Sequence, residues 1–194
     1  MILTKSELKK YLAEERRFYL PKRRAFEWQI TSDNNYKLYQ YVRLLRLTEY
    51  HYNNRGRIIH KLSYVIYRRK KNILGRKLGI EMWENTFAIG LRIAHAGNIV
   101  VNGHCRIGEN CFFHGSNCIG NNGITSEVPR LGKNIHLGVG SKVIGNVELA
   151  DNITIAAGAV VIRSCLIEGA VLAGVPAKVV KVNNAVTRGN QNEC

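Results

Sequence analysis

Residues 131–161 read LGKNIHLGVGSKVIGNVELADNITIAAGAVV, and an apolar side chain returns at every sixth place. The repeated positions are Leu131, Leu137, Val143, Leu149, Ile155 and Val161. A strict period of this kind is typical of solenoids, in which each repeat contributes one strand and one turn. Neighbouring coils then pair in parallel, about 4.8 Å apart, with the repeated side chains pointing inward. The stretch therefore predicts a parallel β-helix.

The same step of six residues can be followed in both directions, from Ile89 to Ala173. Most positions on this step are apolar, although His95 and Thr125 interrupt the series. Small or β-branched residues recur four places later, where they fit the corners of a coil. The alternative is a run of ordinary antiparallel strands with glycine turns, but those would not keep one phase over so many repeats.

The rhythm is weakest at residues 121–129, Asn-Asn-Gly-Ile-Thr-Ser-Glu-Val-Pro. Glycine, asparagine and proline at this density are typical of turns and loops. Loops on a rigid scaffold carry binding and catalytic residues more often than the scaffold does. We therefore predict an irregular loop that projects from the coil, with a tolerated surface insertion as the alternative.

The first 80 residues have a helical pattern instead. Apolar residues recur there at three- and four-residue steps, and Lys and Arg fill the positions between them. We predict helices over about residues 5–18 and on either side of the turn at residues 53–56, the last one ending before Gly79. The chain then divides into a basic α-helical domain at residues 1–78, a β-helix at residues 79–182 and a tail at residues 183–194.

Charge follows the same division. Residues 1–80 hold 20 Lys and Arg against 6 Asp and Glu, a net charge of +14, whereas residues 81–194 carry +1. Such a field attracts polyanions. A solvated helical surface is one interpretation, and contact with an anionic membrane is another, favoured by the basic run at residues 68–71. We expect no nucleic-acid partner, because no recognised motif accompanies the charge.

Several classes of protein are disfavoured by composition. No stretch of 18 uncharged apolar residues predicts a transmembrane helix. The N-terminus is charged from Lys5 onward and lacks the apolar core of a secretory signal, so we expect a cytoplasmic location. The five cysteines are odd in number and contain no Cys-x-x-Cys pair, which argues against a disulfide framework.

Residues 75–182 resemble the serine acetyltransferase branch of the hexapeptide-repeat acyltransferases, and especially its relatives in polysaccharide and capsule loci. The stretches that carry the resemblance are Gly90–Val101 (GLRIAHAGNIVV), Ile107–Cys111 (IGENC) and Ala173–Val179 (AGVPAKV). The resemblance implies a three-sided, left-handed β-helix, which is an exception to the usual right-handed crossover. It also implies acetyl-CoA as co-substrate, no metal, and a homotrimer with active sites between adjacent subunits.

The resemblance assigns roles to individual residues. His95 stands at the position of the family's general base, and Glu81 at that of its supporting acid. A neutral imidazole can accept a hydroxyl proton at pH 7, and we expect direct transfer because no Cys or Ser is singled out beside His95. A structural histidine is the alternative. The matching CoA-binding positions are Gly138, Val139, Ala157, Arg163 and Lys178, and the candidates for holding the acceptor are Asn98, Asn121 and His114.

The acceptor is where the sequence departs from the family. Serine acetyltransferases carry Arg-His before the proline of the projecting loop, whereas Glu127 and Val128 precede Pro129 here. A carboxylate is electrostatically unsuited to bind another carboxylate. We therefore expect acetyl transfer to a sugar hydroxyl in polysaccharide biosynthesis, with serine O-acetylation as the alternative.

Two other functions remain to be weighed. A carbonic-anhydrase-like β-helix needs three metal-binding histidines, two of them five residues apart, and this sequence lacks that spacing. The second is a non-catalytic scaffold, for which His95→Ala would leave the protein's function unchanged.

Overall fold

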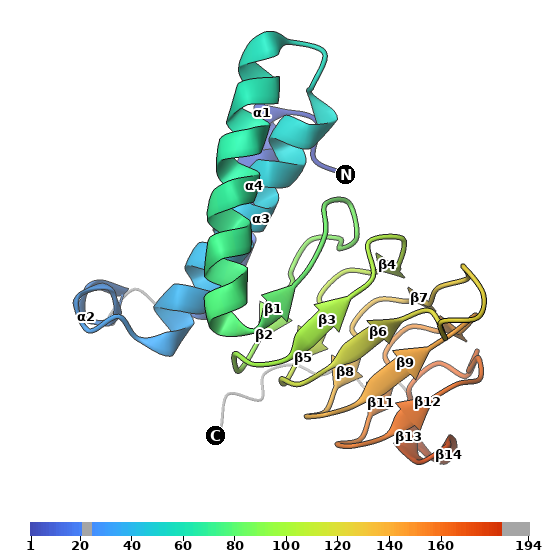
Figure 1. Cartoon of the computed structure of the whole chain (residues 1–194). Coiled ribbons are helices and arrows are strands. Elements are labelled where there is room, and N and C mark those ends of the chain that lie inside the picture. The colour runs from blue at the N-terminus through green and yellow to red at the C-terminus, as the bar shows by residue number, and fades with distance from the viewer. Residues whose placement is uncertain (21–24, 184–194) are drawn as a thin grey trace.

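The computed structural model describes residues 1–20 and 25–183 (Figure 1). Helices occupy the first part of the chain. They are α1 (Lys5–Tyr19), α2 (Ala25–Ile30), α3 (Asn34–Asn53) and α4 (Ile58–Leu78). Short strands follow. They are β1 (Ile80–Glu81), β2 (Arg92–Ile93), β3 (Ile99–Val101), β4 (Arg106–Ile107), β5 (Phe112–Phe113), β6 (Cys118–Gly120), β7 (Arg130–Leu131), β8 (His136–Leu137), β9 (Lys142–Ile144), β10 (Glu148–Leu149), β11 (Thr154–Ile155), β12 (Val160–Val161), β13 (Ala170–Gly174) and β14 (Ala177–Val182).

The strands wind into a three-sided prism. Face A contains β1, β3, β6, β9 and β12, face B contains β4, β7 and β10, and face C contains β2, β5, β8, β11, β13 and β14. The coils pair in parallel, and only the final pair among the described strands, β13 with β14, is antiparallel. This is the mainly β fold with a left-handed parallel β-helix that the resemblance implies, and the prediction is confirmed.

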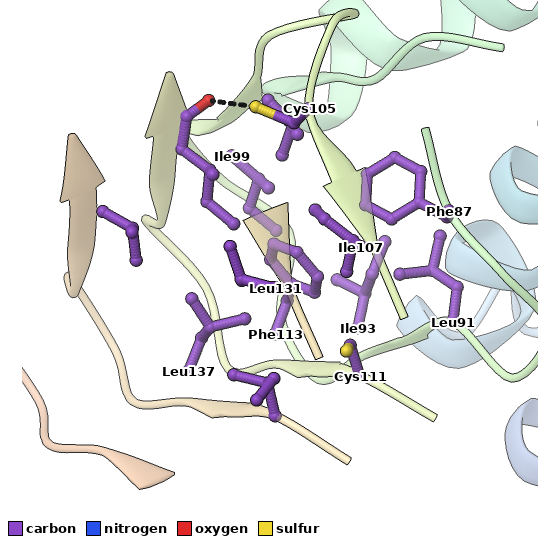
Figure 2. Packing of buried hydrophobic residues seen from close by; sticks show 14 of the residues in the cluster. Phe87, Leu91, Ile93, Ile99, Cys105, Ile107, Cys111, Phe113, Leu131 and Leu137 are labelled. Atoms are coloured by element: carbon purple, nitrogen blue, oxygen red, sulfur yellow. Dashed lines mark hydrogen bonds between the residues drawn. The ribbon is translucent and has the colours of Figure 1, made fainter. Parts of the chain in front are cut away.

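The six-residue rhythm sets which side chains point inward. Phe113 lies opposite Leu137, and Ile119 lies opposite Val143, with all four fully or almost fully buried. Figure 2 shows the same interior from close by. Cys105 also lies there, where burial raises the pKa of its thiol to about 11, so it packs as a small hydrophobic residue.

The six-residue period is interrupted in the turn that follows β2. Ile93 and Val101 both point inward, although they are eight residues apart rather than six. The strict step from Ile89 placed His95 on an inward column, and that prediction was wrong. Two additional residues widen this turn, and His95 is exposed in it. A second slip occurs near the end of the prism, where Ile167 is 50% exposed.

The irregular segment at residues 121–129 is confirmed as a loop. It joins β6 to β7 without a strand, and its residues from Asn121 to Glu127 are exposed. Hydrogen bonds within it are local, such as those from the backbone N–H groups of Ile124 and Thr125 to Oδ1 of Asn122. The loop therefore extends the edge between faces A and B.

The helix predictions at residues 5–18 and around residues 53–56 are also confirmed. Helix α1 begins at a capping box, in which Oγ1 of Thr4 accepts from the N–H of Glu7 at 3.1 Å. Helix α4 ends before Gly79, whose φ of 66° is left-handed. A Cβ on Gly79 would also lie 2.8 Å from the backbone nitrogen of Asn98, so glycine is needed at this junction. The short helix α2 was not predicted.

Two tyrosines join the helices to the first strands of the prism. The hydroxyl of Tyr19 on α1 accepts from the N–H of Ile93 at 2.7 Å and donates to the carbonyl of Leu91 at 3.3 Å. On α3, the hydroxyl of Tyr41 accepts from the N–H of Met82 at 3.1 Å. These strands have no further coil beyond them, so the side chains satisfy backbone groups that another strand would otherwise pair.

Arg46 on α3 makes the third junction. Its guanidinium donates to the carbonyls of Phe87 and Ala88 at 2.9 and 2.7 Å. It also bonds the carboxylates of Glu15 at 2.6 Å and Glu49 at 3.1 Å, and all three side chains are buried. Burial acts to lower the pKa of Arg46, but the two carboxylates raise it well above its ordinary value. Figure 1 shows α1, α3 and α4 gathered at the β1 end of the prism.

We expect Arg46→Met to lower the free energy of unfolding by about 3–5 kcal/mol at pH 7, because it leaves Glu15 and Glu49 buried without a cation. Chemical denaturation followed by circular dichroism measures this. The matched control is Arg17→Met, which removes an ion pair to Glu14 whose side chains are 81% and 42% exposed, and should cost about 1 kcal/mol or less. Equal losses in the two variants would contradict the role of Arg46.

Candidate active site

One edge of the prism carries His95. It lies between faces C and A, where the chain passes from β2 to β3, β5 to β6, β8 to β9 and β11 to β12. Its four layers are residues 94–98, 114–117, 138–141 and 156–158, and we refer to them as the His95 edge. Backbone hydrogen bonds join each layer to the next: Ser116 N–H to Gly97 O, Gly140 N–H to Gly115 O and Gly158 N–H to Val139 O.

The turn around His95 is held by backbone contacts on both sides. The N–H of Ala94 donates to the carbonyl of Phe113 at 2.9 Å, and the N–H of Gly97 donates to that of Leu78 at 2.7 Å. The imidazole of His95 itself is exposed, and within the described residues it makes no hydrogen bond or ion pair. A fixed backbone thus presents a ring whose two nitrogens are available to a ligand.

His114 lies next to His95 on the following coil. Burial lowers the pKa of His114, and the charge of His95 lowers it further. The ring of His114 also lies 4.3 Å from that of Phe112. The structure therefore brings a predicted acceptor residue, His114, close to the predicted general base.

Two buried polar side chains on neighbouring coils, Asn117 and Ser141, support the His95 edge from inside the prism. Oδ1 of Asn117 accepts from the N–H of Gly115 at 3.0 Å, and its amide nitrogen donates to the carbonyl of Gly138 and to Oγ of Ser141. A Cβ on Gly115 would lie 3.4 Å from Cβ of His95. Asn117 thus fixes the backbone that packs against His95. Sequence reasoning missed this role, although two polar residues at buried corner positions were a signal.

Glu81 lies on β1, where it is exposed on face A and aligned with Val100 of β3. It shares a cleft of about 380 Å³ with Asn98, which follows His95 by three residues. No hydrogen bond or ion pair between Glu81 and His95 exists in the part of the chain that is described. The structure brings two of the predicted residues together, in the cleft beside the turn that carries the imidazole.

The same cleft contains groups that the sequence did not indicate. Arg68 and Arg76 of α4 line it together with Trp83, and the guanidinium of Arg68 lies 5.4 Å from the centre of the Trp83 ring. A neighbouring hollow, also lined by Glu81, includes Asn121 at the start of the projecting loop. Positive charge and an aromatic surface therefore face the predicted acceptor residues. They come from elements far apart in the sequence, so spacing could not reveal them.

The residues matched to CoA binding divide between two edges. Gly138, Val139 and Ala157 lie on the His95 edge, where a Cβ on Gly138 would approach the backbone nitrogen of Ala157 to 2.6 Å. Val139 is 50% exposed, and Ala157 is exposed beside it. Arg163, however, follows β12 and lies on the edge between faces A and B.

Lys178 lies on β14, aligned with Ala173 at the end of face C. The structure therefore brings Gly138, Val139 and Ala157 into line with His95, places Lys178 on the last coil and leaves Arg163 elsewhere. Within the described residues, no group of three or more His, Cys, Asp or Glu side chains could hold a metal ion.

The chain is similar in sequence to serine acetyltransferases. The chain is 31% identical over 134 residues to a serine acetyltransferase of Staphylococcus xylosus, covering 63% of this chain and 61% of that protein. It is 26% identical over 134 residues to a serine acetyltransferase of Synechococcus elongatus, covering 63% and 54%. No family model matches the chain.

Solved structures agree on the fold. Soybean serine acetyltransferase complexed with serine has a TM-score of 0.72 at 17% identity, covering 90% of this chain and 70% of that one. A serine acetyltransferase in complex with CoA has a TM-score of 0.70 at 21% identity, covering 91% and 71%. The chain is thus similar to serine acetyltransferases in sequence and in fold. It spans 61% and 54% of the lengths of the two serine acetyltransferases from Staphylococcus xylosus and Synechococcus elongatus.

The proximity of the two imidazoles can be tested by titration. We expect His95→Gln to raise the pKa of His114, because it removes a neighbouring positive charge, but not to its ordinary value, since burial remains. NMR titration of the His114 ring protons measures this, with His104→Gln as the control. An unchanged pKa would contradict the proximity.

The sign of the effect on stability follows from the same shift. The pKa of His114 is lower in the folded chain than the value of about 6.5 expected when unfolded. The unfolded chain therefore binds the proton more readily, and His114 reduces stability as pH falls through that value.

Proposed function

We propose that this protein is an O-acetyltransferase that transfers the acetyl group of acetyl-CoA to a hydroxyl of a small acceptor. The observation that carries the proposal is His95, an exposed imidazole on a rigid edge in line with Val139 and Ala157. The similarity to serine acetyltransferases, one of them solved in complex with CoA, supports the same chemistry.

In this proposal His95 acts as the general base. It accepts the proton of the acceptor hydroxyl while the hydroxyl oxygen attacks the thioester carbonyl. The tetrahedral intermediate then collapses, the carbon–sulfur bond breaks, and the imidazolium returns the proton to the sulfur of CoA. Glu81 is proposed to assist by stabilising the imidazolium and setting its orientation, following the logic of a triad without a covalent nucleophile.

The rest of the site is proposed to come from a neighbouring copy of the chain. The imidazole of His95 makes no hydrogen bond or ion pair within the described residues, and the cleft that contains Glu81 opens on the outer side of face A. A homotrimer with the site between subunits would enclose both. CoA would lie along the His95 edge, with the ammonium of Lys178 near its phosphates. We propose a cytoplasmic location, where acetyl-CoA is available.

Serine is the acceptor that the comparisons support better than a sugar. The relatives found are serine acetyltransferases, and the structures from soybean and Neisseria gonorrhoeae were solved in complex with serine. The positive charge of Arg68 and Arg76 in the cleft beside Asn98 is compatible with a carboxylate.

A sugar hydroxyl in polysaccharide biosynthesis is the second candidate. One observation favours it: Glu127 is exposed on the projecting loop, before Val128 and Pro129, where serine acetyltransferases carry Arg-His. A neutral sugar would not be repelled by this carboxylate.

The role of His95 predicts the effect of its removal. We expect His95→Ala to lower kcat by about 10²–10⁴-fold, the usual contribution of a general base, with little change in CoA affinity. CoA release with a thiol reagent measures the rate, and calorimetry measures the affinity. His60→Ala, on α4 and outside the lining of both hollows, should keep the rate of the unmodified chain. A kcat for His95→Ala close to that of the unmodified chain would exclude the proposed mechanism.

The two acceptors can be separated directly. If serine is the acceptor, CoA release should increase with serine but not with nucleotide sugars or oligosaccharides, and Glu127→Gln should lower the KM for serine by removing a negative charge. If only the sugars support turnover, the serine assignment is wrong and the sugar assignment stands. If neither serine nor the sugars increased CoA release, both acceptor assignments would be refuted.

A further inference from the structure

The outward side of α4 is unusually apolar. Ile58, Ile59, Leu62, Val65 and Ile66 recur at helical spacing, and each of them is between 53% and 70% exposed. The opposite side of α4 packs against α3 and β1, where Lys71 and Gly75 are buried. The helix is thus amphipathic, with its apolar stripe facing away from the protein.

Cations surround this stripe. Helix α4 contains seven Lys and Arg residues and no Asp or Glu. Lys61 lies beside the stripe, and Arg69, Lys70, Arg76 and Lys77 continue the exposed side toward the end of the helix. An apolar strip flanked by Lys and Arg is the pattern of helices that lie in the interface of a membrane.

The basic half of α4 also forms a groove suited to phosphate. A shallow hollow of about 490 Å³ is lined by Arg68, Arg69 and Arg76 together with Val65 and Ile73. Guanidinium groups bind phosphate oxygens in pairs, and the two apolar side chains continue the stripe into the groove. A ligand that joins a phosphate to an apolar chain matches both features.

A second copy of the chain is a poorer partner for this surface. Residues 1–80 carry a net charge of +14, so two such faces brought together would repel each other. An anionic lipid surface has the opposite charge and offers an apolar layer beneath it. No helix in the described residues is long and apolar enough to cross a membrane, so the contact would be peripheral.

We propose that α4 docks the protein onto an anionic membrane, with Ile58, Leu62 and Ile66 entering the boundary of the acyl chains and the exposed Arg69 and Lys70 contacting lipid phosphates. The contact does not depend on the proposed acetyl transfer.

Sedimentation with vesicles tests the proposal on the full chain. Binding is compared between vesicles of phosphatidylcholine alone and vesicles of equal parts phosphatidylcholine and phosphatidylglycerol. We expect binding to the anionic vesicles only, and its loss at about 1 M salt, where the screening length falls to about 3 Å. Equal binding to both vesicle types, or binding to neither, would overturn the proposal.

Matched variants locate the contact. Leu62→Asp with Ile66→Asp should reduce partitioning at least about tenfold, because it places charge in the apolar boundary, whereas Leu166→Asp with Ile167→Asp, exposed elsewhere, should not. Likewise Arg69→Glu with Lys70→Glu should reduce partitioning at least about tenfold, and far more than Lys9→Glu with Lys10→Glu on α1. Equal losses in each pair would mean that the contact is not made by α4.

Two readouts separate membrane docking from misfolding and from self-association. Circular dichroism should show unchanged melting of the Leu62 and Ile66 double variant, because both side chains are exposed. Sedimentation equilibrium should show an unchanged mass. If the mass falls while vesicle binding persists, the stripe is an interface between copies of the chain, and the membrane assignment is wrong.

Discussion

Parallel pairing between successive coils is the constraint on which the site depends. It places each edge position above its counterpart on the previous coil, so that a turn can change only by bulging outward. The two additional residues between Ile93 and Val101 do this, and they carry His95 out of the core. Because the layers below stay in register, Gly115, Val139 and Ala157 remain in line with the displaced imidazole.

The sequence was sufficient to predict the β-helix because nearly every repeat contains the same local signal, an apolar residue at the inward position of each six-residue unit. The turn at residues 53–56 and the end of α4 before Gly79 were equally local signals. The error at His95 has the same origin. A period extrapolated backward from Val143 and Leu137 contains no information about an insertion, and both Ile89 and His95 were therefore placed in the wrong register.

The candidate site was less accessible to sequence reasoning, since it depends on which edge a residue occupies. Arg163 was matched by resemblance alone, and its turn lies on a different edge from Val139. The cleft beside Asn98 needs Arg68 from a helix and Trp83 from a loop, and no spacing connects them. Likewise, the periodicity that predicted α4 could not tell whether Leu62 faces the core or, as observed, the solvent.

The contacts of Tyr19, Tyr41 and Arg46 with the first coil have an implication for solubility. A solenoid ends in strands whose unpaired backbone groups invite another molecule to continue the stack. Here helix side chains bond the first coil at Ile93 of β2, at Met82 just after β1, and at Phe87 and Ala88, of which Phe87 bridges to Ile107 of β4. At the other end of face C, β14 folds back antiparallel against β13. The helices thus cover the first coil and hinder the end-to-end association of prisms into fibres.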